Sequence, residues 1–130
     1  MSDEWTPIFD KEPKELVTAD RIKDYDFQEC MKYLKGVQLS EVAEMRACVP
    51  GEADGPDWHY VIKINDGRFA VVEGGCDYTG WGCQEGGNGS IHATAEEAAK
   101  AAEDDYDRKD ISKQLLAQIA GKQPYGTYIS

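Results

Sequence analysis

The chain has 130 residues, and its 25 Asp and Glu side chains against 14 Lys and Arg give a formal net charge of -11. A chain of this length suits one domain, which can bury a core without needing a disulfide or a metal. We therefore predict a single domain over residues 1–130, with flexible ends at 1–12 and 123–130.

The negative charge narrows the range of partners. It repels the phosphates of nucleic acids and anionic lipid heads, so we expect no direct binding to DNA, RNA or a membrane. A basic protein surface, such as one in a nucleic-acid-binding complex, is the partner that the charge favours. No apolar run approaches the ~20 residues that a membrane span needs, and the first residues do not look like a secretory signal. We expect a cytoplasmic protein with reduced cysteines.

The first predicted element is a helix, because apolar side chains recur there at intervals of three and four residues. These side chains are Phe27, Cys30, Met31 and Leu34. Asp24 or Asp26 can cap its start, and Gly36 can end it. Residues 37–49 then alternate between apolar and polar positions as a strand does, although a short helix capped by Ser40 fits the same stretch.

A hairpin over residues 58–73 is the clearest element. Its first strand places one set of side chains on one face and a second set on the other: Trp58, Tyr60, Ile62 and Ile64 against His59, Val61 and Lys63. Asn65-Asp66-Gly67 supplies the turn, and residues 68–73 return as the partner strand. The window 74–90 then holds seven of the 13 glycines, which predicts a shaped loop followed by a short strand at 91–93.

Two helices are predicted after the sheet. Thr94 and Glu97 form a capping box that opens a stripe of small side chains reaching Tyr106. Asp110 caps a last helix that ends at Gly121, although one long helix through this region also fits. The order of elements indicates an α+β domain, with an antiparallel three- to four-stranded sheet, an N-terminal helix and one or two C-terminal helices packed on one face.

The most distinctive segment is 74–87, which reads Gly-Gly-Cys-Asp-Tyr-Thr-Gly-Trp-Gly-Cys-Gln-Glu-Gly-Gly. Together with residues 65–73 it resembles a group of small bacterial and phage proteins. These share a strand, a Cys-Asp-Tyr-Thr-Gly-Trp-x-Cys-Gln segment and a following helix. The resemblance covers roughly residues 58–105 and implies a similar shape and a bacterial or phage setting, but no catalytic residue.

The leading hypothesis is a non-enzymatic protein-binding module, since no catalytic motif is present and we predict no catalytic residue. The Gly-rich loop would present aromatic anchors, and an acidic helix would imitate the spaced charges of a nucleic-acid backbone. The resemblance makes an inhibitor of a host nucleic-acid-binding or defence protein the most concrete version. The predicted partner-binding residues are Tyr78, Trp81, Asp77, Glu85, Glu103, Asp104, Asp105 and Asp107. Two plainer alternatives are that the aromatic rings pack back on the sheet and that the acidic cluster is a solvated face.

The alternative function is a structural zinc domain or a small metalloenzyme, because Cys76, Cys83, His59 and His92 supply two thiolates and two imidazoles. The six residues between the two cysteines exceed the usual ligand spacing of two to four. We therefore predict no cofactor. The cysteines would then be packing residues, and both histidines would lie half exposed on the sheet.

Overall fold

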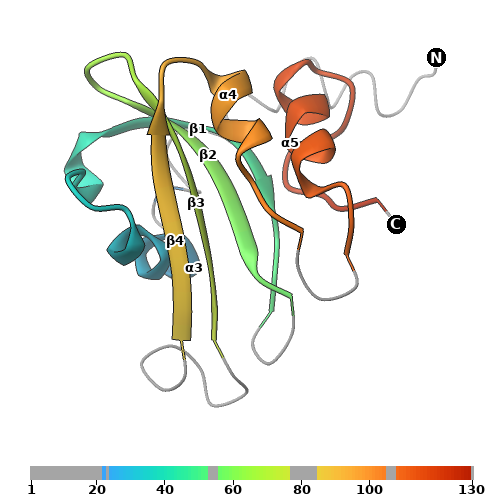
Figure 1. Ribbon diagram of the computed structural model, residues 1–130, viewed down its shortest axis with the longest axis horizontal. Helices are drawn as coiled ribbons and strands as arrows, with labels where there is room; N and C mark the ends of the chain where they lie inside the picture. Colours follow the sequence, from blue (N-terminus) through green and yellow to red (C-terminus); the bar gives the residue numbers. More distant parts are fainter. Residues whose placement is uncertain (1–21, 23, 53–55, 77–84, 105–107, 130) are drawn as a thin grey trace.

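The computed structural model describes residues 22, 24–52, 56–76, 85–104 and 108–129, so the predicted flexible end at 1–12 lies outside the described ranges. Four strands form one antiparallel sheet in the order β1-β2-β3-β4 (Figure 1). The strands are β1 (Val42–Val49), β2 (Trp58–Ile64), β3 (Phe69–Cys76) and β4 (Glu85–His92). The predicted α+β fold with an antiparallel sheet is confirmed. None of the helices in the described ranges is both long and apolar enough to cross a membrane.

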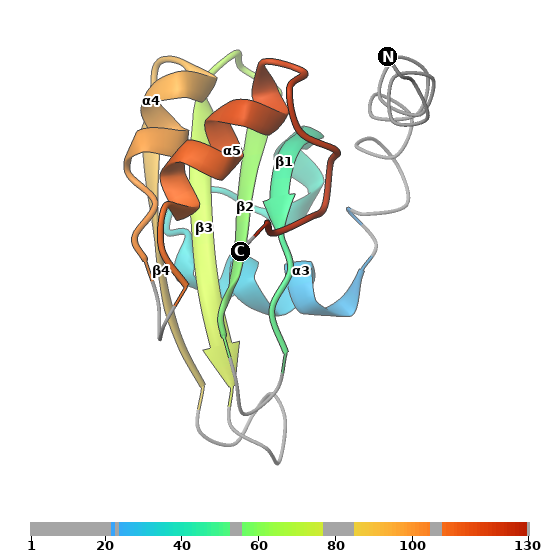
Figure 2. The same ribbon diagram turned by 90° about the vertical axis from the view of Figure 1, so that its right-hand side faces the viewer.

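Helices cover both faces of the sheet, whereas the sequence predicted them on one face (Figure 2). The helical elements are α3 (Tyr25–Cys30), the 3-10 turns η1 (Met31–Tyr33) and η2 (Leu39–Glu41), α4 (Ala95–Lys100) and α5 (Ile111–Ile119). α3 and η1 lie on one face, and α4 and α5 lie on the other. The prediction of one covered face was wrong because β2 is apolar on both sides. Ile62 faces α3, Val61 faces α4 and α5, and both are fully buried.

The larger core lies between the sheet and α3. The Phe27 ring of α3 meets the Tyr60 ring of β2 edge-on, with 5.0 Å between ring centroids. The four side chains predicted to share one face of β2 all point into this core, which confirms that part of the hairpin; they are Trp58, Tyr60, Ile62 and Ile64.

The stretch 37–49 forms the predicted strand from Val42 onward and not the alternative helix capped by Ser40. The short helical turn η2 comes first, and β1 follows from Val42. Two register shifts against β2 interrupt the alternation of buried and exposed positions in β1. The predicted hairpin turn is also present. Gly67 adopts a φ of 95°, and the Asp66 carboxylate accepts a hydrogen bond from the backbone of Arg68 at 3.0 Å.

Most of the described part of the glycine window is strand rather than loop. β3 continues through Gly74 to Cys76, and β4 begins at Glu85 and pairs with β3 along its whole length. The loop prediction was wrong because these glycines serve close packing. A Cβ atom on Gly87 would lie only 2.7 Å from a ring carbon of Tyr33. Cross-strand pairing and this close approach outweigh the weak strand propensity of glycine.

Two separate helices follow the sheet, not one long helix. α4 begins as predicted, because the Thr94 hydroxyl accepts from the Glu97 backbone N–H at 3.1 Å. Asp110 occupies the cap position of α5, but its side chain makes no capping bond there. Asp104 supplies that bond instead and accepts from the N–H of Ile111 at 3.1 Å. A left-handed glycine at 121 ends α5, as predicted.

C-terminal residues that the sequence predicted as a flexible end pack against the domain. Tyr125 is buried, and its hydroxyl donates to the Met45 sulfur at 2.6 Å. The buried Gln123 side chain donates to the Gln114 carbonyl oxygen at 3.0 Å. The Gln123 and Gln114 side-chain amides therefore satisfy each other inside the fold.

Candidate functional site

The end of the sheet that carries the predicted aromatic loop is the first candidate site. Cys76 and Glu85 are register partners, so the chain between them leaves and re-enters the sheet at one place. The β1–β2 connection turns at the same end, since Trp58 at the start of β2 pairs with Gly74 near the end of β3. Five predicted binding residues lie outside the described residues: Asp77, Tyr78, Trp81, Asp105 and Asp107.

Carboxylates from two distant parts of the chain meet beside this end. Asp24 and Asp26 lie at the start of α3, and Asp57 directly precedes β2. Burial and then the charges of Asp26 and Asp57 raise the pKa of the Cys30 thiol. Burial, with smaller contributions that include Asp26 and Asp24, raises the pKa of the Tyr60 hydroxyl. These carboxylates therefore create a shared negative potential around the end of the α3 core.

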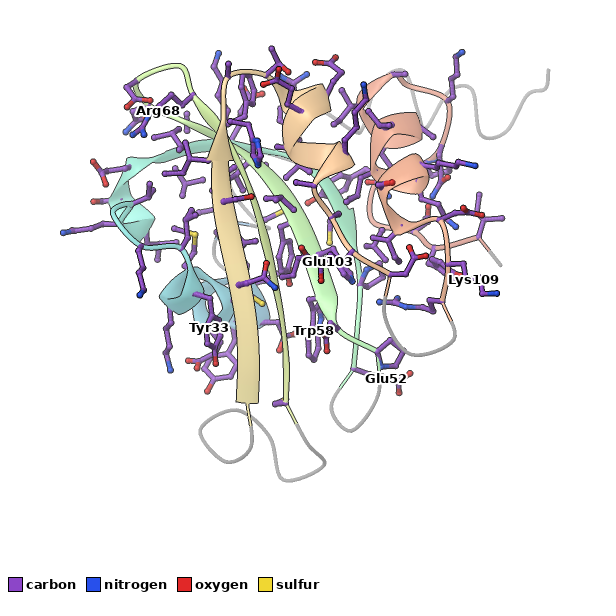
Figure 3. The ribbon with its side chains drawn as sticks, in the orientation of Figure 1. Tyr33, Glu52, Trp58, Arg68, Glu103 and Lys109 are labelled. Carbon is purple, nitrogen blue, oxygen red and sulfur yellow. The ribbon has the colours of Figure 1, made fainter. Side chains whose placement is uncertain are left out.

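Glu52 adds an exposed carboxylate in the β1–β2 connection, at the same end of the sheet (Figure 3). We call Asp24, Asp26, Glu52 and Asp57 the acidic end. Arg108 also reaches this region, where its guanidinium donates to the carbonyl oxygens of Pro50 and Asp57 at 2.6 and 2.5 Å. Sequence reasoning missed the acidic end, since its members are separated by up to 33 positions (57 − 24) and only the fold unites them.

The acidic cluster that the sequence placed on a helix lies elsewhere in the fold. Glu103 and Asp104 are exposed, but they lie in the connection between α4 and α5 and not on a helix. The acidic-helix prediction was wrong because α4 ends at Lys100, before Glu103 and Asp104 are reached. The Asp104 carboxylate also caps α5, so its interactions are not limited to solvent.

A buried polar pair lies beneath this connection. His59 Nδ1 is 2.9 Å from a carboxylate oxygen of Glu73, its register partner on β3. The exposed fractions of the two residues are 1% and 5%. The backbone N–H of Glu103 donates to the same Glu73 oxygen at 3.1 Å. The expectation of a half-exposed His59 was wrong, and the pair joins the α4–α5 connection to the sheet.

The three described members of the alternative zinc set lie apart. Cys76 packs into the core under α3, whereas His59 points to the opposite face of the sheet. His92 lies at the far end of the sheet, where it pairs with Phe69, and its ring nitrogen is 2.7 Å from the Ser90 hydroxyl. The fourth member, residue 83, is outside the described residues. Tetrahedral zinc needs its ligands around one point, so these positions speak against a shared centre.

We expect native mass spectrometry of the purified chain to give the same protein mass before and after treatment with a chelator. The reason is the separation of Cys76, His59 and His92 just described. Loss of one zinc mass, together with a lower melting temperature after chelation, would contradict this expectation.

Cys30 should react slowly in the folded chain. Burial in the α3 core raises its pKa, and alkylating reagents attack the thiolate. At pH 8 we expect iodoacetamide to label Cys30 at least about tenfold more slowly in the native than in the urea-unfolded chain, as followed by peptide mass mapping. Equal labelling rates would contradict the burial of Cys30.

The raised pKa of Cys30 also links stability to pH. Because the folded-state pKa lies above its unfolded value, the contribution of the protonated thiol to stability is complete below a pH of about 9 and declines at higher pH.

Comparisons of the chain with protein-family models, with curated proteins and with solved structures find no match. The resemblance carried by segment 74–87 therefore stays a prediction. Function has to be inferred from the surfaces of the molecule.

Proposed function

We propose that the protein is a non-enzymatic protein-binding module that binds a basic surface of another protein through the acidic end and the loop 77–84. The observation that carries this proposal is that the Asp57 side chain lies against Gly75 near the end of β3, while Asp24 and Asp26 stand at the start of α3, the helix that packs on this face of the sheet. The aromatic loop begins and ends at that same end, between Cys76 and Glu85.

Charge and aromatic side chains would have different tasks in such a complex. The net charge of -11 would attract a basic partner over long range and speed the encounter. Tyr78 and Trp81 would then supply the apolar anchors that slow dissociation, because aromatic side chains dominate many binding hot spots. A protein surface that is basic because it normally binds nucleic acid would suit both the long-range attraction and the aromatic contacts. The phage-type resemblance supports an inhibitor of a host nucleic-acid-binding or defence protein as the specific form of the proposal.

A defined basic probe tests whether the acidic end is the binding surface. We would measure the affinity of a fluorescent decalysine peptide for the wild type and for D26N/E52Q at low salt. The matched control is E96Q/E97Q, which removes the same two charges from exposed positions on α4. We expect D26N/E52Q to weaken binding about fivefold more than the control does, as two exposed ion pairs of about 0.5 kcal/mol each would. Equal weakening by both variants would show diffuse attraction and contradict the proposed surface.

The natural partner allows a second test of the loop. After cross-linking in the native host and identification by mass spectrometry, the complex would be followed by stopped-flow binding. We expect W81A to raise the dissociation rate about 30-fold, as the loss of a hot spot of about 2 kcal/mol requires. Added salt should slow association instead, since it screens the long-range attraction. The control is I129A, which removes an exposed apolar side chain at the C-terminus. Dissociation rates that are equal for both variants would contradict the role of the loop.

A further inference from the structure

A groove lies between β4 and residues 32–35. β4 is the last strand in the order of the sheet (Figure 1). The volume of the groove is about 520 Å³. One wall comes from η1 and the residues that follow it, and the other comes from β4. The lining residues are Lys32, Tyr33, Leu34 and Lys35 on the first wall and 87–91 on the second.

The glycines of β4 let one wall of the groove approach the strand closely. Gly87 and Gly89 alternate with Asn88 and face the α3 side, where Tyr33 and Leu34 approach them. A Cβ atom on Gly89 would lie 3.0 Å from Leu34 Cδ1, so a larger residue at this position would displace the Leu34 side chain. The wall of the groove therefore has apolar side chains that pack directly on the backbone of β4.

The backbone of β4 is available on its outer side. Among the described residues, β4 pairs with β3 alone, so one row of its N–H and C=O groups faces away from the sheet. Natural edge strands are often protected by a proline, a lysine or a short length. None of the eight residues of β4 is a proline or a lysine, and residues 86–88 are exposed. Such an edge is suited to the addition of a further strand.

The charge of the groove is opposite to that of the whole chain. Lys32 and Lys35 are exposed, and no carboxylate is among the described residues that line the groove. Lys32 Nζ contacts Glu29 at 2.6 Å, but an exposed pair of this kind contributes little and can be exchanged for another carboxylate. Within the screening length of about 8 Å at physiological salt, the two ammonium groups favour an acidic neighbour.

We propose that the β4 groove binds an extended, acidic peptide segment of a partner protein by strand addition. The peptide backbone would pair with the outer edge of β4. Side chains at alternate positions would enter the groove between β4 and residues 32–35, and acidic side chains would lie beside Lys32 and Lys35. This surface is separate from the acidic end and does not depend on it. A second copy of the chain is the less suitable occupant, because each copy carries a net charge of -11.

Peptide selection on the full chain tests the proposal. A display library of random nine-residue peptides is selected against the immobilised protein, and enriched peptides are synthesised for fluorescence anisotropy. We expect enriched sequences to be acidic, poor in proline and unable to bind when alternate backbone nitrogens are methylated, because methylation removes the donors that pair with the edge. A selection without enrichment, or binding that survives methylation, would overturn the proposal.

Variants of the groove locate the site. We expect K32E/K35E to weaken the binding of the selected peptides at least about tenfold, since two attractive contacts become repulsive. The matched control, K100E/K122E, makes the same charge change at exposed positions on α4 and after α5 and should have a small effect. Circular dichroism checks that both variants are folded. Equal effects of the two variants, or a concentration-dependent dimer that competes with the peptides in analytical ultracentrifugation, would overturn the proposed occupant.

Discussion

Replacement of Ile62 by alanine should lower the free energy of unfolding by about 2–5 kcal/mol. The side chain is fully buried on β2, an inner strand, and it packs in the core under α3. Its register partners on the neighbouring strands, Met45 and Ala70, are fully buried as well. The substitution therefore removes apolar contacts and leaves a cavity that the paired strands cannot close. Urea unfolding followed by tryptophan fluorescence measures the change.

The neighbouring residue offers a matched control. Lys63 is next to Ile62 on the same strand, points to the other face and is only partly buried. We expect K63T to change the free energy of unfolding by no more than about 0.5 kcal/mol. If I62A also changed the free energy of unfolding by less than about 0.5 kcal/mol, the α3 core would not be what holds the sheet together.

The hairpin was predictable because two independent signals agree there. Apolar residues alternate along residues 58–64, and Asn65-Asp66-Gly67 fixes where the chain reverses. The same turn also fixes the register, in which His59 faces Glu73. The buried His59–Glu73 pair could therefore have been found from the sequence, had the strands been aligned through the turn.

The strand formed by the glycine-rich residues 85–90 could not be predicted from alternation and turn signals. Glycine has weak strand propensity, and nothing local to residues 85–90 shows that they form a strand. Their structure depends on pairing with β3 and on the approach of Tyr33 and Leu34, which come from more than 50 positions earlier (87 − 33 = 54). The β4 groove has the same origin, so it too was invisible in the sequence.

The two acidic regions show how topology changes the interpretation of charge. The sequence drew attention to Glu103 and Asp104, because they stand in a dense run of acidic residues. In the fold, the Asp104 side chain caps α5, and the backbone N–H of Glu103 donates a hydrogen bond to the Glu73 carboxylate. The carboxylates of the acidic end are spread along the sequence, but the fold places Asp57 against Gly75 near the end of β3, and Asp24 and Asp26 at the start of α3. Proximity in space, not density along the chain, determines the local potential.

Replacement of Glu73 by alanine should lower the free energy of unfolding by about 3–5 kcal/mol, the cost of breaking a buried polar pair by removing one partner. The Glu73 carboxylate lies 2.9 Å from His59 Nδ1 and accepts from the N–H of Glu103 at 3.1 Å. Its loss would leave the buried His59 ring and the Glu103 N–H without this oxygen, and water does not reach the His59 ring. E73Q keeps an acceptor oxygen at this position and should cost less, about 1–2 kcal/mol. Urea unfolding of the two variants gives the comparison.

A local measurement separates this pair from a general loss of packing. If Glu73 fastens the α4–α5 connection to the sheet, hydrogen exchange at the Glu103 amide should accelerate in E73A more than exchange at the amides of β2 does. E96A, which removes an exposed carboxylate on α4, is the control and should stay within about 0.5 kcal/mol of the wild type. Similar stabilities of E73A and E96A, with unchanged exchange at Glu103, would show that the connection is held by its apolar contacts alone. In that case the alanine stripe of α4, which packs on Val61 and Val71, would be the element that positions the connection.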